Sequence, residues 1–458
     1  MRNGELSFWM ARDNLEAPVT SPLDCNQAVD VAIVGGGLTG LWAAWALATS
    51  DPSLSISVYE AERLGHGASG RNGGWLSAKP VGLREVLRRH GSGRDGVVTV
   101  ERLLEESMHD VVRILGPASI DATYGGWLQV ARSLPEQRRL EANLANNRSW
   151  GLGEERLRLL TAEQVRERVA VDKAVGALYS PHNYRVDPAK MLLTLARTVQ
   201  QLGVRIYTDS PVVSIKPGRL LVKGHTIEVE RRTVVATEGY TSLQKDQRRR
   251  MLPLNSAMLV TEPLTADEWQ GIGWHRSEGL SGAAHTYFYG QRTADGRIAI
   301  GGRGKPYRFA SGFDHLGEVD AQTVTALEAV LREIFPQVQL RAAHAWCGVL
   351  GVTRDWSPFV EDAIEDRITR AGGYAGQGLA ASHLVGRIIA ALILKPNSDL
   401  TTMPWVRPSP RKWEPEPFRW IGANGLYRAY STADWIEAHS NSGRTSGLAV
   451  LADRIAGR

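Results

Sequence analysis

The start of the chain alternates extended and helical patterns in the way that is typical of a βαβ unit. Residues 29–34 form a largely apolar, β-branched run, as in a buried parallel strand. Residues 38–50 are rich in Ala, Leu and Trp and contain only Gly40 as a helix breaker, which predicts a helix. Residues 56–60 resume the extended pattern. We therefore predict strand, helix and strand, with the glycines 35–37 at the first turn.

The pattern beyond this unit indicates a second domain that interrupts the first. From about residue 122 a strand-like stretch and charged helical stretches follow, and at Asp187 and Pro188 an N-cap and a first-turn proline open another helix. Residues 286–291 and 297–303 predict a hairpin that turns at 294–296. Residues 379–394 are largely apolar all round, which predicts a buried helix. Six prolines between 396 and 417 exclude regular structure there.

Composition places the chain among ordinary globular proteins of more than one domain. Its 458 residues are 43% hydrophobic and 22% charged. No run approaches the ~18 apolar residues of a membrane-spanning helix, and the N-terminus lacks the pattern of a secretory signal; we therefore expect neither integral membrane association nor export. The two cysteines provide no disulfide framework and no zinc spacing. We expect a cytoplasmic protein without a metal site.

The net charge does not indicate a nucleic-acid partner. Lys and Arg number 54 against 49 Asp and Glu, and the excess is spread along the chain. No predicted helix carries a basic stripe, and no nucleic-acid-reading motif is present. We expect a small-molecule partner and no nucleic acid.

Residues 35–40 read Gly-Gly-Gly-Leu-Thr-Gly and satisfy GxGxxG between a predicted strand and a predicted helix. Gly35 allows a tight turn, Gly37 allows close approach to a diphosphate, and Gly40 allows the helix to pack on the strand. The helix amino end supplies NH groups and a partial positive charge for an anion. Glu60 follows the second strand, where a carboxylate can accept hydrogen bonds from an adenosine ribose. The sequence therefore predicts a dinucleotide site, which either a nicotinamide or a flavin nucleotide could occupy.

A second glycine-rich segment favours the flavin. Residues 65–75 read Gly-His-Gly-Ala-Ser-Gly-Arg-Asn-Gly-Gly-Trp, and the glycines would let the main chain pass close to a flat ring. This segment resembles the flavin loop of the FAD-dependent amine and amino-acid oxidases related to glycine oxidase and D-amino-acid oxidase. Residues 68–74 most resemble the γ-glutamylputrescine oxidase branch. The resemblance extends to the ribose acid, to residues 186–188 and 236–239, and to the glycines near residue 376.

The resemblance implies bound FAD and a set of cofactor-binding residues. Ser69, Arg71 and Asn72 would bond phosphate or flavin atoms, and Val213 would present its backbone to the adenine. A turn at 374–379 would lie against the pyrimidine edge of the flavin, because the helix that follows points its amino end at the ring carbonyl. The predicted FAD-binding residues are Gly35, Gly37, Leu38, Thr39, Gly40, Glu60, Ala68, Ser69, Arg71, Asn72, Gly73, Gly74, Val213, Gly376, Gln377 and Gly378.

The fold implied by the resemblance is α/β. It is a Rossmann-type, three-layer ββα FAD-binding domain of the glutathione-reductase type, with an α+β substrate domain built on an antiparallel sheet. The predicted segments are an N-terminal arm (1–28), three FAD-binding parts (29–120, 186–248 and 346–395), two substrate-domain parts (121–185 and 249–345) and a Pro-rich C-terminal extension (396–458).

The resemblance also implies the reaction. A hydride would pass from the carbon beside an amine nitrogen to flavin N5, and water would hydrolyse the resulting imine. The substrate would be a small amino acid, polyamine derivative or N-methyl amine, and oxygen or an electron carrier would be the acceptor. Two alternatives stay open, a nicotinamide-dependent dehydrogenase and a non-catalytic flavin-fold subunit.

Substrate contacts carry no motif, so only candidates can be named. Tyr287 and Tyr289 could wall the substrate site, and Arg303 and Arg354 could bind a substrate anion. Cys347 lies where sarcosine-oxidase relatives attach FAD covalently, but we expect a packed cysteine and non-covalent FAD.

Overall fold

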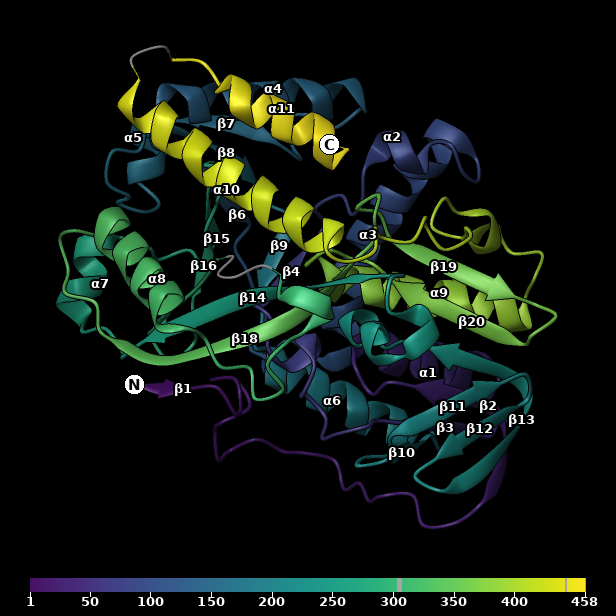
Figure 1. The fold of residues 1–458 in the computed structure, drawn as a ribbon. Coiled ribbons are helices and arrows are strands. Elements are labelled where there is room, and N and C mark those ends of the chain that lie inside the picture. The colour runs from purple at the N-terminus through teal and green to yellow at the C-terminus, as the bar shows by residue number, and fades with distance from the viewer. Residues whose placement is uncertain (303–306, 441–442, 458) are drawn as a thin grey trace.

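The chain forms two large β-sheets, each covered by helices (Figure 1), in a computed structural model that describes residues 1–302, 307–440 and 443–457. One sheet has eight strands: β2 (Gln27–Val34), β3 (Ile56–Tyr59), β10 (Arg205–Tyr207), β11 (Val212–Lys216), β12 (Arg219–Val222), β13 (His225–Val235), β19 (Phe359–Ala363) and β20 (Ile368–Gly372). Its centre is parallel, since β2 runs beside β3 and β13, and β13 also pairs in parallel with β20. The predicted βαβ unit is confirmed.

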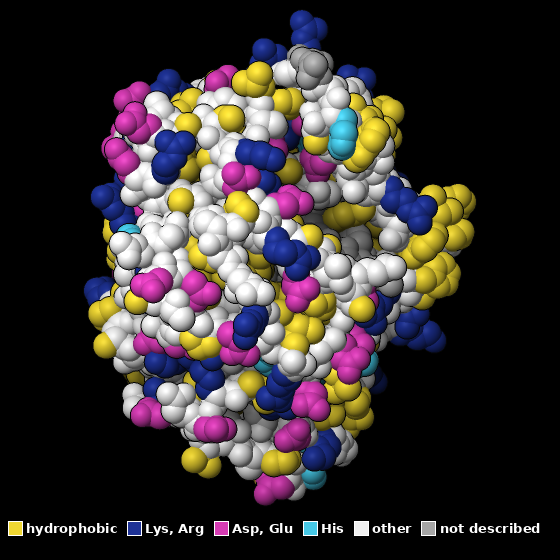
Figure 2. All heavy atoms as spheres, turned by 90° about the vertical axis from the view of Figure 1, so that its left-hand side faces the viewer, with side chains coloured by type: hydrophobic (Ala, Val, Ile, Leu, Met, Phe, Trp, Pro, Cys, Tyr) yellow, Lys and Arg dark blue, Asp and Glu magenta, His cyan; other side chains and the backbone are white. Residues whose placement is uncertain are grey.

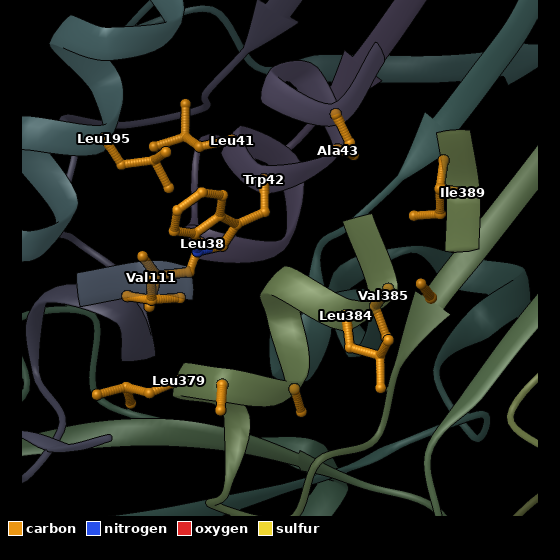
Figure 3. Packing of buried hydrophobic residues seen from close by; sticks show 14 of the residues in the cluster. Leu38, Leu41, Trp42, Ala43, Val111, Leu195, Leu379, Leu384, Val385 and Ile389 are labelled. Atoms are coloured by element: carbon orange, nitrogen blue, oxygen red, sulfur yellow. The ribbon is translucent and has the colours of Figure 1, made fainter. Parts of the chain in front are cut away.

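Helices pack on this sheet through an almost continuous apolar core. They are α1 (Leu38–Ser50), α3 (Gly93–Leu115), α6 (Pro188–Gln201) and α9 (Gly378–Leu394). Trp42 is fully buried and lies among Leu41, Val111 and Leu195 (Figure 3). The backbones of α1 and α9 are in direct contact where the helices cross at Gly386. A Cβ at this residue would lie only 2.6 Å from the carbonyl carbon of Trp42, so a side chain does not fit there. This packing fixes the amino ends of both helices relative to each other.

The second sheet is largely antiparallel and has nine strands. In sheet order they are β1 (Arg2–Asn3), β18 (Ala342–Val352), β14 (Leu252–Thr261), β17 (Ile298–Gly302), β16 (Tyr289–Arg292), β15 (Gly279–Gly282), β6 (Trp127–Ala131), β8 (Gly176–Ser180) and β7 (Arg158–Thr161). The predicted hairpin is confirmed as β16 and β17, with Tyr289 opposite Gly301. The helices of this part are α4 (Leu134–Ser149), α5 (Ala162–Arg166), α7 (Ala266–Ile272) and α8 (Ala321–Ile334).

Short elements complete the chain. A three-stranded sheet is made of β4 (Trp75–Ser77), β9 (Asn183–Arg185) and β5 (Thr123–Tyr124), and α2 (Arg84–Leu87) is a single turn. The 3₁₀ turns are η1 (Ala68–Gly70), η2 (Ala118–Ile120), η3 (Glu238–Leu243), η4 (Lys245–Gln247), η5 (Phe309–Ser311) and η6 (Asp399–Thr402). No helix among the described residues has the length and apolar character needed to cross a membrane.

One predicted segment boundary is wrong. The division between residues 345 and 346 falls inside β18, which pairs with β14 along its whole length and belongs to the nine-stranded sheet. The glycines 348 and 351 resemble a turn in the sequence, but their lack of side chains serves close packing against neighbouring segments instead. The substrate-domain segment therefore extends to residue 352.

The C-terminal extension becomes helical directly after its last proline, Pro417. Helices α10 (Phe418–His439) and α11 (Gly447–Ala456) form the yellow end of the chain and pack on each other (Figure 1). The Asp434 carboxylate accepts hydrogen bonds from the backbone N–H of His285 and of Thr286, both at 2.8 Å. Glu437 accepts from Arg139 at 2.5 Å. The extension is thereby fastened to the substrate domain.

Acidic and basic side chains alternate over the face in Figure 2, with no broad patch of one sign. The predicted absence of a nucleic-acid partner stays a prediction.

Candidate active site

The amino end of α1 is built from the glycines of the first motif. Its N-cap is Gly37, which offers no side-chain cap to the first turn. Gly35 has φ = 108°, a conformation that favours glycine, and a Cβ on Gly40 would lie 2.0 Å from the Gly35 carbonyl oxygen. The backbone N–H of Leu38 donates to Ser69 Oγ at 2.9 Å. The second glycine-rich loop therefore meets the first motif at the helix amino end.

Glu60 lies beside the same glycines. Its Oε2 accepts from the backbone N–H of Gly36 at 2.8 Å, and its Oε1 accepts from that of Glu62 at 3.1 Å. Burial raises the pKa of Glu60, and these two hydrogen bonds oppose that rise. The carboxylate is thus fixed at the end of β3, next to the predicted diphosphate position.

The second loop is shaped by Asn72. The Asn72 Nδ2 group donates to the Ser69 carbonyl at 2.7 Å, and Oδ1 accepts from the Gly74 N–H at 2.8 Å. Gly74 has φ = 69°, and a Cβ there would lie 2.4 Å from the Val186 carbonyl oxygen. The loop can take this form only with glycine at residue 74.

Arg71 has a structural role, and its contact with the cofactor stays a prediction. Its buried guanidinium donates to the carbonyl oxygens of Glu5 (3.2 Å), Leu316 (3.3 Å) and Cys347 (2.9 Å), rather than presenting all its donors to a phosphate. The loop crosses the nine-stranded sheet at this point, and unpaired buried carbonyls would be costly. Arg71 therefore joins the loop to the substrate domain.

The glycine turn before α9 lies close to the first motif. Ala375 and Gly376 have φ values of 51° and 100°, and α9 begins at Gly378 after Gln377 as N-cap. The Tyr374 hydroxyl lies 3.0 Å from Thr39 Oγ1 in α1. The first glycine motif and this turn, separated by more than 300 residues in sequence, therefore lie in contact.

The carboxyl group of Glu238 holds the backbone at the start of this turn. Its Oε1 accepts from the backbone N–H groups of Gly373 (2.9 Å) and Tyr374 (3.2 Å), and burial raises its pKa to about 7. Glu238 itself has φ = 44°, which is unusual for a residue with a side chain. The sequence analysis did not single out this carboxyl group, because its role depends on the distant turn.

A cavity of about 1000 Å³ runs from the second glycine-rich loop and the turn before α9 into the substrate domain. Ala68, Asn72 and Gly73 line it on one side, and Gly376 and Gln377 line it on another. Its remaining wall includes the aromatic residues Trp75, Trp127, Trp150, Tyr287 and Tyr289. Such a concave, partly aromatic chamber with a few polar groups is typical of a small-molecule site.

Two of the four predicted substrate-contact residues line the cavity. Tyr287 and Tyr289 both line the cavity, and the Tyr289 ring lies against Gly73 while its hydroxyl is 2.9 Å from Ser256 Oγ. Arg354 does not line the cavity; its guanidinium donates to Glu414 at 3.1 Å in the C-terminal extension. The expectation of a substrate anion at Arg354 is therefore corrected, since Glu414 already neutralises it. Arg303 lies outside the described residues.

Val213 lies at a register shift between Val212 and Ser214 in β11, and its side chain is 65% exposed. The shift leaves its backbone outside the regular ladder. Its contact with adenine stays a prediction.

Cys347 does not line the cavity, although its neighbours Gly348 and Leu350 do. Trp346 Nε1 donates to the Arg71 carbonyl at 2.9 Å, so residues 346 and 348 face the second loop and residue 347 faces away, as strand alternation requires. Burial raises the pKa of the Cys347 thiol to about 11.

Lys79 lines the cavity and is not among the predicted site residues. It follows β4, and its Nζ lies 3.9 Å from the ring centroid of Trp127 and 5.1 Å from that of Trp75. A signal was present, because Lys79 is the sole charged residue between Arg71 and Arg84.

Comparison with known proteins identifies the class. Residues 30–392 match the family model "DAO: FAD dependent oxidoreductase", so the chain belongs to the DAO family of FAD-dependent oxidoreductases. It is 28% identical to gamma-glutamylputrescine oxidoreductase of Escherichia coli over 84% of this chain and 88% of that protein. It is 28% identical to D-amino acid dehydrogenase of Vibrio atlanticus, over 50% of this chain and 54% of that protein. Glycine oxidase from Geobacillus kaustophilus superposes with a TM-score of 0.67 at 20% identity, covering 80% of this chain and 94% of that chain.

The residues present fit FAD. The amino end of α1, where the N-cap Gly37 has no side chain, suits a diphosphate, and Glu60 beside Gly36 suits a ribose. The cavity between the second loop and the Gly376 turn suits a flat ring, because glycine backbone forms both of these walls. The family match thus agrees with FAD rather than a nicotinamide nucleotide in the first motif.

Proposed function

We propose that this protein oxidises the C–N bond of a small primary or secondary amine and that the resulting imine is hydrolysed by water. The substrate would be an amino acid, a polyamine derivative or an N-methyl amine. Bound FAD supplies the hydride acceptor, and oxygen or an electron carrier then reoxidises it. The observation that carries the proposal is the cavity that joins the second glycine-rich loop and the Gly376 turn to the aromatic residues Trp75, Trp127, Tyr287 and Tyr289.

The cavity walls suit this chemistry. Tyr287 and Tyr289 can orient an amine against the second loop, and the aromatic walls reduce its contact with water. A less solvated site favours the neutral amine over the ammonium ion, and only the neutral amine has the free electron pair that the oxidation needs. No dedicated base has to be assigned for this step.

We further propose that FAD is held without a covalent bond and that the protein is cytoplasmic. The first proposal is supported by the orientation of Cys347 away from the cavity and by its raised pKa, since the thiolate is the reactive form. The second is supported by the unpaired state of Cys25 and Cys347, which suits a reducing compartment.

The test is anaerobic addition of a panel of amines to the FAD-loaded protein, with the flavin absorbance followed near ~450 nm. We expect bleaching by at least one class of amine, followed by recovery of the colour on admission of air if oxygen is the acceptor. Peroxide assays then distinguish an oxidase from a dehydrogenase. A protein that binds FAD but is bleached by no amine would refute the proposal, and acid precipitation that leaves flavin in the pellet would refute non-covalent binding.

A further inference from the structure

Lys79 occupies an unusual place on the cavity wall. Its ammonium group lies between the indole rings of Trp75 and Trp127, which come from β4 and β6. Both rings are held in place: Trp75 Nε1 donates to the Gly290 carbonyl at 3.2 Å, and Trp127 is 6% exposed. The side chain is therefore positioned by aromatic faces rather than by an acid.

Each of the other Arg side chains of the cavity wall is paired with an acid, bonded to backbone carbonyls or exposed. Arg84 is joined to Glu101 by hydrogen bonds of 2.5 and 2.8 Å, and Arg156 forms an ion pair with Glu105. Arg71 is engaged with three backbone carbonyls, and the Arg89 side chain is exposed. No ion pair joins Lys79 to an acid among the described residues, and burial alone lowers its pKa to about 8.

This environment leaves the charge of Lys79 unbalanced. Aromatic faces stabilise a cation without accepting its N–H bonds as an anion would, and an ammonium group has three donors to place. Glu85 is the one acidic residue among the described residues of the wall, and its carboxylate is paired with Arg88. A second cation entering this chamber would be repelled, whereas a carboxylate would gain a charge-assisted hydrogen bond.

We propose that Lys79 binds a carboxylate group of the substrate and thereby selects amines that carry an acid over free polyamines. This inference rests on the proposed amine oxidation and names the substrate class of the same site. Lys79 acts here as a specificity-determining residue, and the reacting C–N bond lies elsewhere on the substrate.

The test uses two sets of matched amines on the FAD-loaded enzyme without oxygen. The first set is 5-aminopentanoate, 1-aminopentane and 1,5-diaminopentane; the second is alanine, 2-aminopropane and 1,2-diaminopropane. Within each set, the members differ in whether the group beyond the amine is a carboxylate, a methyl or a second ammonium. The dissociation constant for each amine is obtained from the concentration dependence of flavin bleaching.

We expect the wild-type enzyme to bind the carboxylate member of a reactive set most tightly. Lys79→Met, which keeps the apolar stem, should weaken that member by about ten- to a hundred-fold and leave the methyl member within about two-fold. Lys79→Arg should retain most of the preference. The matched control is Lys216→Met, at an exposed lysine of β11, which should change nothing.

Two outcomes would overturn the proposal: a wild-type enzyme that binds the methyl or diamine member as tightly as the acid, or a Lys79→Met enzyme that keeps the preference. The wild-type comparison decides even if the variant fails to fold. If no amine bleaches the flavin, the proposed function has failed instead, and calorimetric titration of the holoenzyme with pentanoate still tests Lys79. Heat of binding in the wild type that is lost in Lys79→Gln would support the carboxylate site, whereas no binding to the wild type would refute it.

Discussion

The hydroxyl groups of Thr39 and Tyr374 lie 3.0 Å apart, one in the first glycine motif and one in the turn that leads into α9. Both side chains are buried. This single hydrogen bond connects the segment expected to hold the diphosphate with the segment expected to meet the flavin ring.

Removing either hydroxyl should therefore loosen the cofactor site. Tyr374→Phe should lower the free energy of unfolding by about 1 kcal/mol, and Thr39→Val should lower it by a similar amount. In a double-mutant cycle measured by urea unfolding, the two effects should not add, because each variant removes the same bond. Fully additive effects would show that the hydroxyls stabilise the protein independently.

Arg71 offers a test between a structural role and a phosphate-binding role. Arg71→Met removes a donor that joins carbonyls of three separate segments in partly buried hydrogen bonds, so we expect a loss of about 1–3 kcal/mol in unfolding free energy of the FAD-free protein. Exposed Arg428→Met on α10 is the matched control. Unchanged stability with strongly weakened FAD binding would instead restore the phosphate role.

Glu238 should give the protein a distinctive pH dependence. Its pKa is raised from an ordinary 4.5 to about 7 by burial, so the folded state holds a proton that the unfolded state has released. The contribution of Glu238 to stability is therefore fully present below about pH 4.5 and is lost as the pH rises through about 7. The loss should be about 2–3 kcal/mol between these limits.

Glu238→Gln should remove that part of the pH dependence, because the amide does not titrate in this range. Urea unfolding of the FAD-free protein at pH 5 and pH 8 gives the measurement, with the exposed Glu365→Gln as control. The assignment fails if the Glu238→Gln protein loses as much stability as the wild type between the two pH values.

Asp434 links the C-terminal extension to the cavity wall. Its carboxylate holds the backbone of residues 285 and 286, directly before Tyr287. Asp434→Ala should raise the dissociation constant for a substrate amine several-fold and speed proteolysis of α10, without weakening FAD binding. Intact substrate affinity alongside faster proteolysis would mean that α10 covers the domain without positioning Tyr287.

The sequence was informative where chemistry depends on neighbours along the chain. The βαβ unit, the position of Glu60 directly after β3 and the β16–β17 hairpin all follow from local patterns and short turns. The approach of the two glycine segments followed from the family resemblance, and the Thr39–Tyr374 bond agrees with it.

Contacts between distant segments could not be predicted in this way. Arg354 is a candidate anion binder from its charge alone, and only the folded chain brings Glu414 to it. Arg71 likewise meets carbonyls of residues 5, 316 and 347, and β18 continues through a glycine-rich stretch because β14 pairs with it. Lys79 stands out in the sequence as the sole charged residue between Arg71 and Arg84. That it has no acidic partner among the described residues follows only from the folded structure.

The position of β13 at the middle of its sheet has a consequence for the order of folding. Thr233 pairs with Ala32 in β2 on one side and with Ile368 in β20 on the other. Strand β2 can pair with β3 early, but it meets β13, its second neighbour, only after about half of the polypeptide has been made. The sheet is finished only when the ribosome has passed β20. Pairing over such separations slows folding and leaves strand edges exposed in the meantime. Fragments that end before residue 372 should therefore aggregate instead of folding into a stable FAD-binding domain.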